Sequence, residues 1–255
     1  MQLDDSVANW MFAATEWWLG EFGPIASDSL ALPINAHFPS PDPHDLLQVV
    51  IDRCAMRGEG WNFVLEDESD AVMDNPMTNV PHPAVSKTVL QQEGDGTLSP
   101  GAALPVPFSQ ETAENPLALV ASFATSLSHY LIGSAQVPPP GDEEHWEATV
   151  DLGTVLLGFG IFTANSAFEL NHYEEGLMAG WSSAVRGELG QDALGYAIAL
   201  FVELSGADEQ QILEHLDANP KSSYKWARKQ FRTSRSLDVD RLRAVEPNAS
   251  AGPYR

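Results

Sequence analysis

The chain has 255 residues, of which 44% are hydrophobic and 9% aromatic, so it can bury the core of a folded globular protein. Its one cysteine, Cys54, excludes an internal disulfide and is expected to be a core residue of a cytoplasmic protein. The acidic N-terminus does not resemble a signal peptide, and the apolar stretch over residues 150–162 is too short for a bilayer, so no membrane association is expected.

The net charge of −23 is unevenly distributed along the chain. Residues 1–220 hold 33 Asp/Glu and four Lys/Arg, whereas residues 221–255 hold three Asp/Glu and nine Lys/Arg. An acidic body repels phosphate backbones, so nucleic-acid binding is not expected. The basic C-terminal stretch contacts a polyanion, lies on the acidic body, or pairs with a neighbouring subunit of a homo-oligomer.

Apolar residues at three- and four-residue steps predict a first helix over residues 6–22. Its aromatic face, with Trp10, Trp17 and Trp18, is either part of the core or a docking surface. Asp45 then opens a second helix. Short strands and long loops complete the N-terminal part: strands over 30–35, 61–67 and 87–91, and loops over 68–85 and 93–115.

From Pro116 the sequence is typical of helices. Asn115 is the expected N-cap of a helix that starts at Pro116 and ends at Gly133. The remaining helices are expected over 143–168, 190–206, 207–219 and 220–231. The helix over 143–168 is apolar all round after its first two turns, as in the middle of a core. After about Ser234 the polar chain is expected to be poorly ordered.

These elements predict a mostly helical α+β fold. A small N-terminal β layer packs on a helical body that has two central antiparallel helices. Residues 1–233 are expected to form one domain, divided near residue 115 into an N-terminal α/β part and a helical part. Residues 234–255 form a basic, flexible tail.

The two central helices carry a partial zinc motif. A gluzincin site takes two histidines in H-E-x-x-H on one helix, a glutamate that polarises the metal-bound water, and a third ligand from a following helix. Here the corresponding five residues read T-S-L-S-H and end at His129. Glu147 and Asp151 follow as E-x-x-x-D, at a spacing that suits an antiparallel helix hairpin. Thr125 and Ser126 stand where the motif has its first histidine and its glutamate.

Four segments also resemble a family of uncharacterised bacterial proteins: "LPINAHFPSP", "NPLALVASFATSLSHYL", "EATVDLGTVLLGFGIFTANSAF" and "LGQDALGYAIALF". Members carry H-E-L-x-H before a similar T-D-L-x-x-x-x-x-G-x-G-x-F-x-A-N helix, and the resemblance covers roughly residues 30–205. It implies a zincin-like fold and metallohydrolase activity. It also implies that His129 matches the second histidine, while Glu147 and Asp151 match the downstream acids.

The chain departs from this pattern at the two residues on which the chemistry depends. Threonine is a poor zinc ligand and serine is no general base near neutral pH, so Thr125 and Ser126 replace neither lost group. The leading interpretation is therefore a catalytically inactive, zincin-like pseudo-metallopeptidase that binds a protein or a small molecule, or has a structural role, without a cofactor.

Two alternatives stay open. The first is a zinc-dependent hydrolase with a shifted ligand set around His129 and Glu147, with Asp151 orienting the histidine. The further histidines that could complete that set are His37, His82, His145 and His172. The second is a partner subunit that docks through the tryptophan face or the basic tail.

Three polar residues in apolar surroundings need partners. His129 is either a ligand or a core histidine bonded to Glu147 or Asp151. Asn165 bonds to the region of Thr125 or to a loop backbone. Arg186, one of four basic residues in the acidic body, pairs with a structural carboxylate or an anionic ligand. Asn165 and Arg186 mark a possible ligand cleft between the two central helices.

Overall fold

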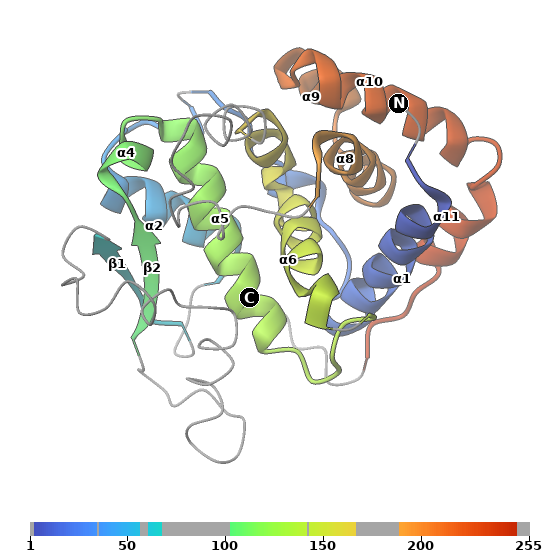
Figure 1. Cartoon of the computed structure of the whole chain (residues 1–255), viewed down its shortest axis with the longest axis horizontal. Helices are drawn as coiled ribbons and strands as arrows, with labels where there is room; N and C mark the ends of the chain where they lie inside the picture. Colours follow the sequence, from blue (N-terminus) through green and yellow to red (C-terminus); the bar gives the residue numbers. More distant parts are fainter. Residues whose placement is uncertain are drawn as a thin grey trace.

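The computed structural model describes residues 3–34, 36–56, 61–67, 103–141, 143–166 and 189–248. Within these ranges the molecule is mostly helical and has one small sheet (Figure 1). The strands are β1 (Phe63–Asp67) and β2 (Leu104–Phe108). The helices are α1 (Asp5–Phe22), α2 (Pro43–Arg53), α4 (Gln110–Ala113), α5 (Pro116–Gly133), α6 (Trp146–Thr154), α8 (Gln191–Ser205), α9 (Glu209–His215), α10 (Ala218–Phe231) and α11 (Ser236–Arg243).

The helices α5 and α6 lie antiparallel in the middle of the molecule, as the sequence predicts (Figure 1). The side chain of Asn115 caps α5 by accepting from the N–H groups at its start, and Pro116 occupies the first turn. Ser128 Oγ donates to the carbonyl of Val150 at 2.8 Å. A Cβ at Gly153 would overlap Ser128 Oγ, so the glycine permits this close approach. The two helices are therefore in direct contact at mid-length.

The helix that begins with α6 changes geometry in its second half. A π-helical turn spans Val155–Phe159, and within it Gly158 has a φ of +100°. A Cβ at Gly158 would overlap the carbonyl of Ser29, and the Gly158 carbonyl accepts from the Ala31 N–H at 3.0 Å. The turn therefore holds the segment that follows α1.

That segment corrects one prediction. Residues 30–34 form no strand, because their backbone N–H groups bond outside any strand ladder. Ala31 donates to the π-helical turn, and the Leu32 N–H donates to Nδ1 of His37 at 3.0 Å. The consecutive buried residues Leu30, Ala31 and Leu32 reflect burial against neighbouring elements and not a place in a sheet.

The sheet has two strands in parallel register, with Phe63 opposite Leu104. It is fastened to α5 by Tyr130, whose hydroxyl donates to the Pro105 carbonyl at 2.8 Å. Burial raises the pKa of Tyr130 to about 12, so this donor stays protonated. β1 confirms the strand predicted over 61–67. The loop predicted over 93–115 is wrong in part, because this range contains β2 and α4. The strand predicted over 87–91 and the loop predicted over 68–85 lie outside the described residues.

The N-terminal helices α1 and α2 occur close to their predicted positions. The second helix starts at Pro43 with Asp42 as its N-cap, two residues before the predicted start at Asp45. Cys54 follows α2, is 2% exposed, and has a thiol pKa that burial raises. Its expected place in the core is therefore confirmed.

The helices α8, α10 and α11 form the other half of the molecule together with α1 (Figure 1). α8 is buried along its length and ends at Gly206 in the left-handed conformation, as its sequence predicts. The poor order expected after Ser234 is wrong for residues 236–243, which form α11. Val239 and Leu242 are 2% and 1% exposed, so two apolar side chains anchor this otherwise polar helix.

Within the described ranges, two helices are long and apolar enough to cross a membrane by length and composition: α5, and the helix from Trp146 to Ser166. Inside the molecule, 56% of the α5 window and 89% of the longer window are buried. The helix from Trp146 to Ser166 is longer than the apolar stretch over residues 150–162 that the sequence shows. Because core helices of soluble proteins pass the same test, the finding is weak evidence for a membrane span.

Candidate functional site

Thr125 and Ser126 each hydrogen-bond to the backbone of their own helix. Thr125 Oγ1 donates to the Ala121 carbonyl at 2.9 Å, and Ser126 Oγ donates to the Ser122 carbonyl at 3.1 Å. Each hydroxyl thus bonds to the carbonyl four residues earlier, as is common for these residues inside helices. Both are partly buried, and neither supplies an imidazole or a carboxylate at this point of α5.

His129 lies one turn further along α5 and faces the start of α6. Its ring packs edge-on against Trp146, with the two ring centroids 5.5 Å apart. Glu147 is the next residue of α6, and both Nε2 of His129 and Oε1 of Glu147 are buried atoms. The structure therefore brings the region of His129 and Glu147 together, as the helix-hairpin spacing predicts.

Asp151 is almost fully buried, with 2% exposure, and one of its bonds ties two helices together. Its Oδ2 accepts from the Leu189 N–H at 2.9 Å, just before α8 begins. A buried carboxylate with a backbone donor is a stable arrangement. This bond gives Asp151 a structural role at the α6–α8 contact.

Asn165 bonds to a loop backbone, which was one of the two alternatives. Its Nδ2 donates to the His215 carbonyl at 2.8 Å, and its Oδ1 accepts from the Asp217 N–H at 3.0 Å. The amide therefore fixes the junction between α9 and α10. Arg186, its predicted companion in a ligand cleft, lies outside the described residues.

Of the four histidines that could complete a shifted zinc set, the two that the structure describes, His37 and His145, have different neighbours. His145 is exposed and packs against Trp10, with ring centroids 5.8 Å apart. His37 is the acceptor for Leu32 N–H, while His82 and His172 lie outside the described residues. Among the residues that the structure does describe, no three His, Cys, Asp or Glu side chains are grouped as a metal site.

A cavity of about 540 Å³ lies at a different place, between the segment after α1, the end of α2 and the α8–α9 junction. This volume falls within the range of small-molecule sites, roughly 300–1,000 Å³. Its lining joins apolar and charged side chains. The lining residues that matter chemically are Asp28, Leu30, Leu32, His37, Arg53 and Asp208.

Arg53 is held in a defined orientation at this cavity. Its NH1 donates to the Leu30 carbonyl at 3.3 Å, and its guanidinium lies over the Phe38 ring at 5.7 Å. Burial lowers the pKa of Arg53, although an arginine remains charged. Burial, and secondly the charge of Arg53, lower the pKa of His37. The cavity therefore contains a cation beside a neutral imidazole.

The sequence contains little that could have revealed this cavity. Arg53 belongs to the same small set of basic residues in the acidic body as Arg186, so rarity alone did not separate them. Its lining comes from three segments that are far apart in the chain. Only the tertiary structure brings them together.

The two docking surfaces proposed for a partner are engaged within the chain. Trp10 and Trp17 donate from their indole N–H groups to the carbonyls of Pro140 and Val137, at 3.2 and 2.8 Å. Trp18 is 2% exposed and belongs to the core. The first helix therefore buries much of the predicted tryptophan face against the turn between α5 and α6.

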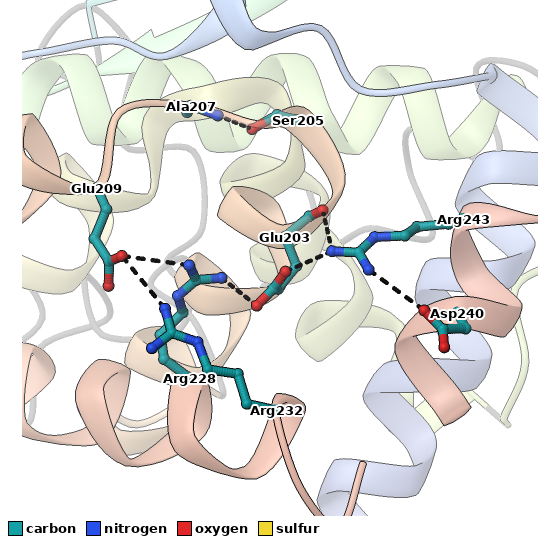
Figure 2. A network of polar contacts seen from close by, with 8 residues as sticks. All are labelled: Glu203, Ser205, Ala207, Glu209, Arg228, Arg232, Asp240 and Arg243. Atoms are coloured by element: carbon teal, nitrogen blue, oxygen red, sulfur yellow. Dashed lines mark hydrogen bonds and ion pairs between the residues drawn. The ribbon is translucent and has the colours of Figure 1, made fainter. Parts of the chain in front are cut away.

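The described part of the basic C-terminal stretch, residues 221–248, contacts the acidic body. Figure 2 shows Arg228 between Glu203 and Glu209, and Arg243 between Glu203 and Asp240. Burial alone would raise the pKa of Glu209, but the hydrogen bond and charge of Arg228 outweigh it and hold that pKa below its usual value. The network joins α8, α9, α10 and α11.

Two further arginines extend these contacts to the first helix. Arg235 pairs with Asp5 at 3.1 Å, and Arg241 pairs with Glu16 at 3.4 Å. Of the three alternatives for the basic stretch, contact with the acidic body is thus the one that its described part adopts.

Comparison of the chain with protein-family models, curated proteins and solved structures gives no match in any of the three. The resemblance to zincin-like bacterial proteins consequently depends on the quoted segments alone.

Proposed function

We propose that this chain is a zincin-like protein without peptidase activity that acts as a binding or structural module. The observation that carries the proposal is the pair of hydroxyls on α5. Thr125 and Ser126 occupy the positions of a zinc ligand and a general base, and each bonds back to its own helix. A hydroxyl in that state neither ligates zinc well nor accepts a proton near neutral pH.

The remaining parts of the motif have structural uses that are consistent with the proposal. His129 packs on Trp146, and Asp151 bonds to the backbone at the entry of α8. These contacts stabilise a helix pair whether or not metal is bound. They explain how a helix hairpin of this kind can persist after its chemistry is lost.

The proposal is tested by restoring the motif. The double variant Thr125→His, Ser126→Glu should bind about one zinc per chain, because histidines four residues apart point to the same side of a helix. The variant Thr125→Val, Ser126→Ala is the matched control, since it alters the same two positions without adding ligands. Zinc binding by the restored variant, with neither zinc nor casein hydrolysis in the native chain, supports the proposal. Hydrolysis by the native chain that chelators abolish contradicts it.

A second candidate is a metal-dependent hydrolase with ligands His129 and Glu147. Its support is that both side chains carry a buried polar atom near the α5–α6 contact. A third ligand would come from elsewhere in the chain, for example His172. Zinc in the native protein that is lost on His129→Ala would favour this candidate over the first.

A further inference from the structure

We propose that the cavity beside Arg53 binds a small zwitterion that has an apolar side chain, namely a free amino acid or a dipeptide. The inference goes beyond the proposed function, which concerns α5 and α6. It is carried by the chemistry of the side chains that line the cavity: one oriented cation, one imidazole, an apolar wall and two carboxylates.

The cation is available to a ligand. Arg228, Arg232, Arg235, Arg241 and Arg243 each form an ion pair with a carboxylate of the chain. In the described part of the molecule, by contrast, no ion pair involves Arg53. Its contacts with the Leu30 carbonyl and the Phe38 ring fix the guanidinium plane and leave further N–H groups for a bidentate carboxylate.

His37 supplies a second donor of suitable kind. Its Nδ1 accepts from the Leu32 N–H, so in the neutral ring the proton is on Nε2. The lowered pKa keeps the ring neutral near pH 7. A neutral N–H donor beside a guanidinium suits a carboxylate without adding a second full charge.

The other residues that line the cavity suit the ammonium group and the apolar side chain of a zwitterion. Leu30 and Leu32 are buried residues with 9% and 6% exposure, and they form an apolar wall. Asp28 and Asp208 line the same cavity and are exposed carboxylates that attract an ammonium group. One cavity thus offers partners for a carboxylate, an ammonium group and an aliphatic side chain.

The net charge of the protein favours a zwitterionic ligand over an anionic one. With a net charge of −23, the molecule repels any ligand that carries net negative charge. A zwitterion carries no net charge, and so it can place its carboxylate on Arg53 without this cost. The same argument disfavours phosphorylated metabolites and dicarboxylates.

Isothermal titration of the native chain with L-leucine and with L-leucyl-L-leucine tests the inference. Two analogues each lack one charged group: 4-methylpentanoate has no ammonium group, and 3-methylbutylamine has no carboxylate. Each analogue should bind at least about tenfold more weakly, because it loses a hydrogen bond between charged groups. Binding of leucine, of the dipeptide or of both supports the inference and tells which size the cavity accepts.

Two variants locate the site. Arg53→Gln should weaken binding at least about tenfold, whereas Arg232→Gln, which removes one exposed positive charge elsewhere, should leave it unchanged. Near-ultraviolet circular dichroism of these two variants and of Arg53→Lys shows whether each is folded. Arg53→Lys keeps the positive charge but loses the bidentate contact, so its weaker binding would be due to that contact. No binding of either zwitterion at millimolar concentration, equal binding of 4-methylpentanoate, or equal binding by Arg53→Gln would overturn the inference. The zinc content of the protein, which tests the proposed function, does not depend on these binding results. Failure of one proposal can therefore be told apart from failure of the other.

Discussion

At the scale of single residues, Gly158 links the core helix to the wall of the cavity. Its φ of +100° is accessible to glycine at little cost, and a Cβ there would overlap the Ser29 carbonyl. We therefore expect Gly158→Ala to destabilise the protein by about 2–5 kcal/mol, from left-handed strain and backbone overlap together. Urea unfolding followed by circular dichroism measures the change.

Gly190→Ala is the matched control for that variant. Gly190 has a φ of −60°, and a Cβ there would meet nothing within 4 Å. Its free energy of unfolding should change by less than about 1 kcal/mol. Equal effects of the two substitutions would mean that Gly158 has no special role in holding the segment after α1.

Residue-scale signals in the sequence predicted some of these positions and missed others. The cap at Asn115 and the stop at Gly206 were readable because each depends on local backbone chemistry. The two glycines of the G-F-G sequence differ in what they approach: Gly160 packs against Ile198 of α8, whereas Gly158 approaches the backbone of Ser29. Such a contact between distant segments leaves no local pattern.

At the scale of elements, α11 is attached by two apolar residues on a polar helix. Leu242 is 1% exposed, whereas Leu237 on the same helix is 82% exposed. Leu242→Ala should lower the free energy of unfolding by about 2–4 kcal/mol, and Leu237→Ala should change it by less than about 0.5 kcal/mol. Chemical denaturation of both variants measures the two changes in the free energy of unfolding. If this segment were a flexible tail, both substitutions would have equally small effects.

The ion pairs between α8, α9 and α10 predict a dependence of stability on pH. The pKa of Glu209 lies below its usual value of 4.5, so its ionised form is favoured by the fold. The stabilisation is present above pH 4.5 and is lost as the pH falls through the lowered folded-state value. Glu209→Gln should therefore be less stable than the native chain at pH 7, and the difference should shrink as the pH falls below 4.5.

Glu214→Gln provides the control on the same helix. Glu214 accepts from the Gln210 side chain at 2.9 Å and is exposed. Its substitution should have a small effect, because exposed contacts of this kind contribute on the order of 0–1 kcal/mol. Thermal unfolding at several pH values measures both variants, and a pH-independent gap for Glu209→Gln would contradict the assigned role.

Elements were predictable where one pattern dominates. The long amphipathic and apolar helices α1, α5 and α8 follow from their periodicity and caps. β2 was missed because L-P-V-P-F contains two prolines, which normally argue against a strand. Among the described residues, β2 pairs only with β1, and an edge strand tolerates proline. α11 was missed because two buried side chains are too few to produce a clear period.

At the scale of the whole molecule, the uneven charge acts within the chain. The C-terminal arginines neutralise carboxylates of α1, α8 and α9 and so fasten the end of the chain to its beginning. The sequence showed the asymmetry but could not choose between internal and external partners. The pairing of the two central helices was predictable from the spacing of their residues. The hydrogen-bond partners of Asp151 and Asn165 were not, because they come from distant segments of the chain.

We propose that the α5–α6 hairpin holds no catalytic zinc, because Thr125 and Ser126 offer neither a zinc ligand nor a general base. The measurement that tests it most directly is the zinc content of native protein, purified without a metal-binding tag and dialysed after zinc is added. We expect well below about 0.1 zinc per chain, because zinc sites need three or four good ligands. About one zinc per chain, abolished by His129→Ala, would contradict the claim and make this helix pair a working metal centre.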